Sequence, residues 1–226
     1  MAARIYPIQT GFTVNYLIGG DGGAVLIDGG VPNSLPVFRK GFAKAGIEPA
    51  QVRLIVVTHG HWDHTGSVKA VKDFTGAPVA MHGLEKDWLE KSLMFMPPGV
   101  TPFGRFLSRF FRLFLPLVNV PAAPVDVVLG GEDFPLSDHG IPGRVLYTPG
   151  HTLGSVSVLL ETGEAFVGDL AMNRFPMTLR PGFPIFAEDM AKVRESWRLL
   201  LEQGVRLVYP SHGKSFPADV MAGLVR

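Results

Sequence analysis

The 226-residue sequence contains no cysteine. This absence excludes disulfide bonds, a thiolate nucleophile and zinc–sulfur sites together. Any metal ion that the chain binds must therefore be held by histidine, aspartate or glutamate. Histidine is itself scarce, with seven in the whole chain, so a local concentration of histidines is informative.

Charge is also sparse, because charged residues make up 18% of the chain and the formal net charge is +1. Nucleic-acid binding calls for a clear basic surplus, so we expect a small-molecule substrate and no nucleic acid. Apolar residues make up 46%, which is enough for a packed core. The length suits one sizeable domain, or at most two small ones, and we expect a single domain over residues 1–226.

Long apolar runs are missing as well. No run approaches the roughly 20 residues that span a bilayer, so no transmembrane segment is predicted. Residues 1–12, MAARIYPIQTGF, contain neither the long apolar stretch nor the small-residue cleavage site of a signal peptide. These features predict a cytoplasmic protein.

Short β-type segments and helical segments alternate along the chain, in two similar halves. This order predicts an α/β fold in which two sheets pack face to face with helices outside. Periodicity alone leaves other α/β arrangements open. The expected strands are 12–18, 23–29, 53–57, 77–81, 125–129, 144–148, 155–160, 165–168 and 206–210. Helices are expected at 34–45, after the histidines near residue 60, and within 187–203.

Residues 58–66, THGHWDHTG, carry the strongest functional signal. His59 and His61 are two positions apart, whereas Asp63 and His64 are adjacent, and all follow the apolar run 54–57. At a turn that leaves a strand, this spacing lets several side chains converge, which neighbouring residues of a regular helix do not do. Imidazole and carboxylate suit zinc or a similar divalent ion, so the motif predicts a metal site.

Three further candidates each lie where a predicted strand ends: His151 in TPGHTLGS, Asp169 in AFVGDL and His212 in YPSHG. Taken alone, an aspartate in such a position is more often a cap or turn residue, and each histidine is as often structural as functional. Together with the cluster they make seven candidate metal ligands. The set is His59, His61, Asp63, His64, His151, Asp169 and His212.

These motifs, in this order, resemble those of the metallo-β-lactamase superfamily, and TPGHTLGS is similar to its glyoxalase II-like and lactonase-like branches. The resemblance runs from about NYLIGG to SHG, nearly the whole chain. It implies a four-layer αββα sandwich with the site at one edge, between the sheets. It also implies one metal ion bound by His59, His61 and His151, a second bound by Asp63, His64 and His212, and Asp169 bridging the two.

The resemblance further implies two divalent metal ions, with zinc favoured and iron or manganese as alternatives. Two such ions lower the pKa of a shared water and so supply a bridging hydroxide as nucleophile. By analogy with the superfamily, Asp63 is the candidate proton shuttle to the leaving group. Asp28, in VLIDGG, resembles an aspartate close behind the metals, and we expect it to orient a histidine, a strand-end turn being the alternative. We expect His82 to begin a surface helix, a position facing the cleft being the alternative.

The function predicted from these features is metal-dependent hydrolysis of a carboxylic ester, a thioester or a lactone. A mononuclear iron enzyme resembling persulfide dioxygenases is the alternative, because it has similar motifs but need not use Asp63 and His64 as ligands. A phosphodiesterase of the same fold is another. Asp169 and the lack of a signal peptide argue against a β-lactamase. Glyoxalase II proper has a further helical domain, whereas here fourteen residues follow His212, so glutathione thioesters are not expected.

A Phe/Arg-rich insert at about 93–120 stands apart from this pattern and contains six of the sixteen phenylalanines. Prolines on both sides limit a predicted helix at 103–115, on which Arg105, Arg109 and Arg112 share one side. The insert is interpreted as a plain core cover, a lid over the metal cleft, a homodimer contact or an interfacial helix. We favour the lid or the dimer contact, because insertions between the two halves of this fold lie beside the site.

Overall fold

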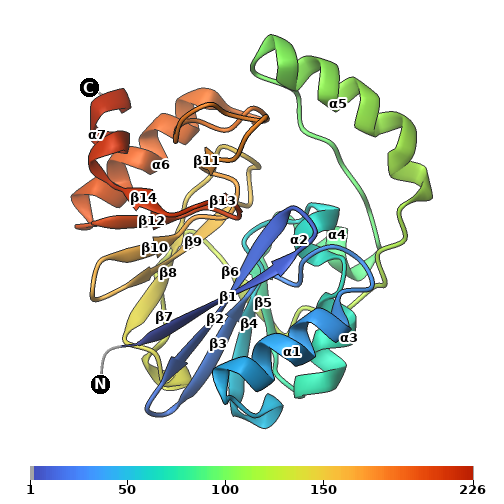
Figure 1. Cartoon of the computed structure of the whole chain (residues 1–226), viewed down its shortest axis with the longest axis vertical. Helices are drawn as coiled ribbons and strands as arrows, with labels where there is room; N and C mark the ends of the chain where they lie inside the picture. The colour runs from blue at the N-terminus through green and yellow to red at the C-terminus, as the bar shows by residue number, and fades with distance from the viewer. Residues whose placement is uncertain (1–2, 226) are drawn as a thin grey trace.

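Two six-stranded sheets packed face to face form the centre of the computed structural model, which describes residues 3–225 (Figure 1). In the first sheet, β1, β2 and β3 are antiparallel and β3 to β6 are parallel. Parallel strands are buried on both faces, which accounts for the continuous apolar runs at this point of the sequence. The strands, in spatial order, are β1 Arg4–Thr10, β2 Thr13–Gly20, β3 Gly23–Ile27, β4 Val52–Val56, β5 Val79–His82 and β6 Val127–Leu129.

The second sheet comes from the C-terminal half of the chain. Its pairs are antiparallel except for β10 and β12, which are parallel. In spatial order the strands are β14 Phe216–Pro217, β12 Leu207–Tyr209, β10 Glu164–Phe166, β9 Val156–Leu160, β8 Gly143–Tyr147 and β7 Phe134–Pro135. A separate parallel pair joins β11 Met172–Asn173 to β13 His212–Gly213.

Helices cover the outer faces of both sheets. Gly46 ends α1 and Gly76 ends α3, each with a positive φ that glycine adopts without strain. Asp189 caps α6 by accepting hydrogen bonds from two backbone N–H groups of its first turn. The helices are α1 Leu35–Ala45, α2 Trp62–Thr65, α3 Val68–Thr75, α4 Lys86–Glu90, α5 Pro102–Phe114, α6 Met190–Glu202 and α7 Asp219–Val225, with 3₁₀ turns η1 Pro49–Gln51, η2 Leu115–Leu117 and η3 Ser137–His139.

Three apolar clusters separate the layers. One lies between the first sheet and α1 and α3 and is centred on Phe38 and Phe42. The second lies between the two sheets, and the third packs Trp197 of α6 against the second sheet. This succession of helix, sheet, sheet and helix confirms the predicted αββα sandwich.

The insert departs from the layered pattern. Its helix α5 begins and ends within one residue of the predicted 103–115, but only Gly104 and Ser108 of this helix are buried. The alternative of a plain core-covering helix is therefore wrong, because most of its large apolar side chains are exposed. Among residues 3–225, no helix is both long and apolar enough to cross a membrane.

Candidate metal centre

The first four candidate ligands lie in the loop that follows β4 and in the short helix α2. His59 lies in this loop, His61 is the N-cap of α2, and Asp63 and His64 occupy its first turn. Parallel strands β3 and β4 end at the same edge of the sheet, so Asp28, directly after β3, lies behind this loop. The change from strand to one helical turn accounts for the uneven spacing of the histidines.

The other three candidates come from the second half of the chain. His151 lies in the turn after β8, Asp169 follows β10, and His212 begins β13. All seven side chains are buried, and the structure brings them together where the two sheets meet. The packing of one sheet on the other thus brings together candidate ligands that are far apart in the sequence.

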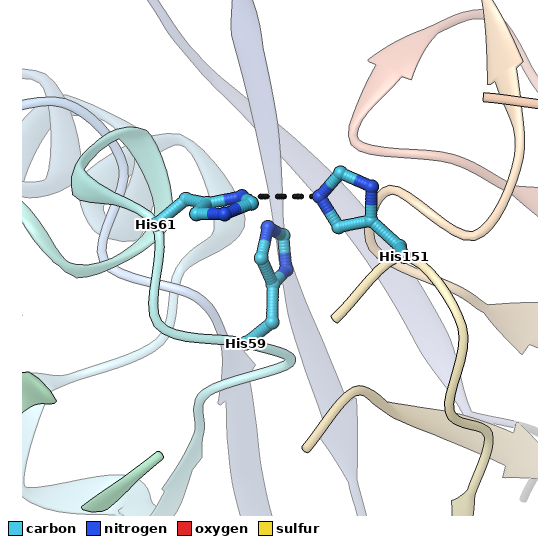
Figure 2. Close-up of side chains that lie close together, drawn as sticks. All are labelled: His59, His61 and His151. Carbon is cyan, nitrogen blue, oxygen red and sulfur yellow. Dashed lines mark hydrogen bonds between the residues drawn. The ribbon is translucent and has the colours of Figure 1, made fainter. Parts of the chain in front are cut away.

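The seven side chains form overlapping groups in which the potential ligand atoms lie within 4.8 Å of one another. Figure 2 shows the rings of His59, His61 and His151 pointing toward one another, with His151 Nε2 3.0 Å from His61 Nδ1. A second group contains Asp63, His64 and His212, and a third joins Asp169 to His59 and His64. His212 Nε2 lies 3.2 Å from a carboxylate oxygen of both Asp63 and Asp169.

This donor set fits divalent metal ions. The Nε2 atoms of His59 and His61 are buried and have no hydrogen-bond partner among residues 3–225. A buried polar atom without a partner is costly, and metal coordination is one way to satisfy it. With only nitrogen and oxygen donors, the site suits zinc and similar ions and does not discriminate among them.

Hydrogen bonds behind the ligands fix the orientation of three imidazoles. His64 Nδ1 lies 2.8 Å from Asp28 Oδ2, His151 Nδ1 lies 2.9 Å from the Phe186 carbonyl oxygen, and His212 Nδ1 lies 3.1 Å from the Phe12 carbonyl oxygen. Because each acceptor favours a proton on Nδ1, the Nε2 lone pair is left for a metal ion. The Asp28 contact is the one expected from the sequence, and Asp28 also accepts a hydrogen bond from the Thr58 N–H.

Burial and charge divide the histidines into two kinds in the metal-free protein. Burial, and then the neighbouring His151, lower the pKa of His61 to about 3, and burial likewise lowers the pKa of His59. Burial opposes protonation of His212, but the carboxylates of Asp169 and Asp63 outweigh it and raise the pKa of His212 to about 10. The His59 side is therefore neutral, whereas the carboxylate side attracts cations.

A cavity of about 190 Å³ opens onto this centre, reached by His61, Asp63, His151, Asp169 and His212. Its remaining lining is apolar, so the site combines a polar floor with hydrophobic walls. Trp62 is one wall residue and contacts Phe12 edge to face. The apolar lining consists of Phe12, Trp62, Phe95, Met96, Pro97, Phe111, Met172, Met177 and Phe186.

Glu85 is a site residue that the sequence did not reveal. It is buried, and its carboxylate accepts hydrogen bonds from Gly60 N–H at 2.6 Å and from Gly154 N–H at 2.7 Å. Gly60 lies between two candidate ligands and Gly154 lies in the turn that holds His151, so one carboxylate joins the two loops. A single glutamate in HGLEKDW has no local pattern that would identify this role.

His82 is placed differently from the expectation. It is the buried last residue of β5 and its ring stacks on Tyr147 with centroids 4.5 Å apart, so the predicted surface helix start is wrong. The apolar strand before it continues one residue further than expected. The ring is absent from the cavity lining.

Comparison with known proteins agrees with the geometry. Residues 8–212 match the model of the Metallo-beta-lactamase superfamily, and the chain belongs to that family. The archaeal metallo-beta-lactamase superfamily protein from Sulfolobus tokodaii is structurally similar, with a TM-score of 0.71 and 23% identity over 99% of this chain and 84% of that one. At this identity the likeness shows the fold alone.

Two curated relatives of low sequence identity have names that state a function of those proteins. The probable metallo-hydrolase YflN of Bacillus subtilis (strain 168) is 27% identical over 154 residues, which cover 66% of this chain and 56% of that protein. The atrochrysone carboxyl ACP thioesterase of Aspergillus chevalieri is 26% identical over 203 residues, or 89% of this chain and 51% of that protein. The chain thus spans little more than half the length of these relatives.

Proposed function

We propose that this chain is a dinuclear metal-dependent hydrolase that cleaves a carboxylic ester, a thioester or a lactone bearing an apolar group. The observation that carries the proposal is the convergence of seven buried donor side chains, five of which form the floor of an apolar cavity. His59, His61 and His151 would hold one ion, Asp63, His64 and His212 the other, and Asp169 lies between both groups.

The bound ions, zinc or alternatively iron or manganese, would activate a water and polarise the scissile carbonyl. Asp63 would carry the proton to the leaving group, because its carboxylate faces the cavity. Thr13 Oγ1 donates a 3.0 Å hydrogen bond to Asp63 Oδ2 and so holds this carboxylate in place. The apolar walls would bind the acyl or aromatic part of the substrate and exclude water from it.

The thioesterase name among the relatives supports a thioester or a related acyl substrate, and the motif TPGHTLGS supports the glyoxalase II-like or lactonase-like branch. The identity of 26% is too low to transfer a substrate. A cytoplasmic location and a small-molecule substrate remain the predictions made from the sequence.

The test is a substrate panel of thioesters, lactones, carboxylic esters, phosphodiesters and β-lactams, run on protein of measured metal content. We expect about two metal equivalents and turnover of an acyl substrate. Asp63→Asn should lower kcat on the order of 100-fold, the usual scale for loss of a positioned acid or base. Asp73→Asn, at an exposed carboxylate on α3, is the matched control.

Two outcomes would contradict the proposal. One is the absence of turnover across the panel by fully metal-loaded protein. The other is one iron equivalent with oxygen uptake on a persulfide, which would favour the dioxygenase alternative. Phosphodiester cleavage alone would move the assignment to the phosphodiesterase alternative.

A further inference from the structure

Helix α5 presents large apolar side chains to solvent instead of to the core. Phe106, Leu113 and the following Leu117 are 66%, 73% and 80% exposed. The helix contacts the body through Leu107 and Phe111, which pack in one cluster with Ile185, and through Gly104, which lies against the Ile185 backbone. Within the insert, Ser108 Oγ donates to the Pro97 carbonyl oxygen. Figure 1 shows α5 (green) on the outside of the molecule, joined to it by long connections. The exposed apolar side chains are Phe103, Phe106, Phe110, Leu113, Phe114 and Leu117.

Arginines run along the flank of this apolar face. Arg105, Arg109 and Arg112 are exposed and recur at i, i+4 and i+7, each directly before an exposed Phe106, Phe110 or Leu113. Residues 92–125 contain these three arginines and no acidic residue. A short helix with an apolar face and an arginine flank is typical of helices that lie in the surface of a lipid bilayer.

The neighbouring loop, residues 173–183, has the same character. Phe175 and Leu179 are 75% and 86% exposed, and Arg180 is exposed beside them. The loop adjoins the insert, because Met177 packs in one cluster with Phe111 of α5. Residues 170–187 contain two arginines and no acidic residue.

Basic and acidic residues are therefore unevenly distributed in this chain, although its net charge is close to zero. The two segments together hold five of the 21 basic residues and none of the 20 acidic ones, so the rest of the chain is net negative. A second copy of the chain is a poor occupant of this surface. An antiparallel pair of α5 helices would bring the arginine flanks to the same side, where neither segment offers a carboxylate.

We propose that α5 and the 173–183 loop form a docking surface for an anionic lipid bilayer. The phenylalanines and leucines would enter the boundary between headgroups and acyl chains, and the arginines would contact the anionic headgroups. A hollow lined by Trp62, Phe110 and Phe114 lies next to the metal-site cavity, and Trp62 and Phe111 belong to both. The docked face is thus continuous with the route to the metal centre. The proposal goes beyond the proposed function and does not depend on it.

Co-sedimentation of the full chain with vesicles tests this docking without any substrate. We expect binding to phosphatidylcholine vesicles that contain about 30% phosphatidylglycerol, weak binding to pure phosphatidylcholine, and weakening by salt. Phe106→Ser/Leu113→Ser and Arg105→Ala/Arg109→Ala should each lower binding to anionic vesicles by roughly tenfold or more. All four positions are exposed, so these variants should fold.

Matched controls come from exposed residues elsewhere: Val128→Ser on β6 for the apolar change and Lys40→Ala/Lys44→Ala on α1 for the charge change. Both should bind as the unaltered protein does. Equal binding to neutral and anionic vesicles, or equal effects of control and α5 variants, would overturn the proposal. The proposal would also be overturned if the protein did not bind vesicles and light scattering showed a dimer that Phe106→Ser/Leu113→Ser converts to a monomer.

Discussion

At the scale of single residues, Glu85 joins the loop of His59 and His61 to the loop of His151. Glutamine at this position has one acceptor oxygen, so Glu85→Gln can accept from either Gly60 N–H or Gly154 N–H but leaves the other facing an amide donor. We expect a stability loss of about 1–3 kcal/mol and a fall in metal affinity of roughly 10- to 100-fold. Thermal unfolding of the metal-free protein and competition with a chromophoric chelator measure the two effects.

Glu90→Gln is the control for this prediction. Glu90 Oε1 also accepts a backbone hydrogen bond, from Val125 N–H, which glutamine can keep. Its Oε2 lies 3.1 Å from Lys86 Nζ in a partly exposed ion pair, whose loss costs little stability. Neither carboxylate oxygen of Glu90 contacts a ligand loop. Metal affinity should be unchanged in this variant. If Glu85→Gln loses stability but keeps the metal affinity of Glu90→Gln, the carboxylate has a structural role without influence on the metal centre.

The candidate ligands could be predicted from the sequence because dense His/Asp spacing and strand-end turns are local features. His59, His61, Asp63 and His64 lie within one short segment, and His151, Asp169 and His212 each follow a recognisable strand. Glu85 could not be predicted, because its role exists only where two loops distant in sequence meet. The same holds for the cavity walls, which come from several separate segments.

At the scale of elements, α5 supplies one wall of the metal-site cavity through Phe111. A lid that binds the acyl group predicts that Phe111→Ala raises KM for long-chain acyl substrates by roughly tenfold, since a buried aromatic contact is worth a few kcal/mol at most. KM for acetyl substrates should change little. Steady-state kinetics on a chain-length series measures this difference.

Phe103→Ala tests the same helix at a position that does not line the cavity. It removes the same ring from an exposed site, so both chain lengths should retain their KM. Equal losses on long and short substrates in Phe111→Ala would show that α5 supports the fold of the site without contacting the substrate, and the lid interpretation would be wrong.

Strands and helices with a strong apolar period were predicted within a few residues, as for α1, β4 and α6. Strand β1, Arg4–Thr10, was missed, because its polar and partly exposed residues give no buried run at this edge of the sheet. The side on which α5 contacts the body could not be predicted. Apart from its arginines the helix is apolar on most of its surface, so only tertiary contacts reveal which of its residues face the body. These are Gly104, Leu107, Ser108 and Phe111.

At the scale of the whole molecule, the candidate metal centre lies where the two sheets meet. Four candidate ligands come from the first half of the chain and three from the second, and in the metal-free protein protons on histidines balance the buried carboxylates. Metal ions that bind the folded state alone would add stability by mass action, and they would replace those protons. Stability should therefore depend on pH differently with and without metal.

The pKa of His212 is raised to about 10, against 6.5 for an unperturbed histidine, and this shift determines whether stability rises or falls with pH. Protonation of His212 stabilises the metal-free fold fully below pH 6.5, and this contribution is lost as the pH rises toward 10. We expect the Tm of metal-free protein to fall by roughly 5–10 °C between pH 6.5 and 9.5. Metal-loaded protein lacks that proton, so the difference in Tm between the two forms should widen over this range.

Differential scanning calorimetry at four pH values, with and without a chelator, measures this difference. His59 and His61 do not alter the sign, because burial lowers their pKa and they are neutral throughout the range in both forms. Burial also opposes protonation of His64, but the carboxylates of Asp28, Asp63 and Asp169 outweigh it and raise the pKa of His64, so His64 adds to the decline in the same direction. His212→Asn removes one of these two titrating groups, so its metal-free form should show a smaller decline in Tm. The difference in Tm between metal-loaded and metal-free protein could instead stay constant or narrow as the pH rises. Protons on the histidines would then not balance the buried carboxylates of the metal-free centre, and the inferred charge balance would be wrong.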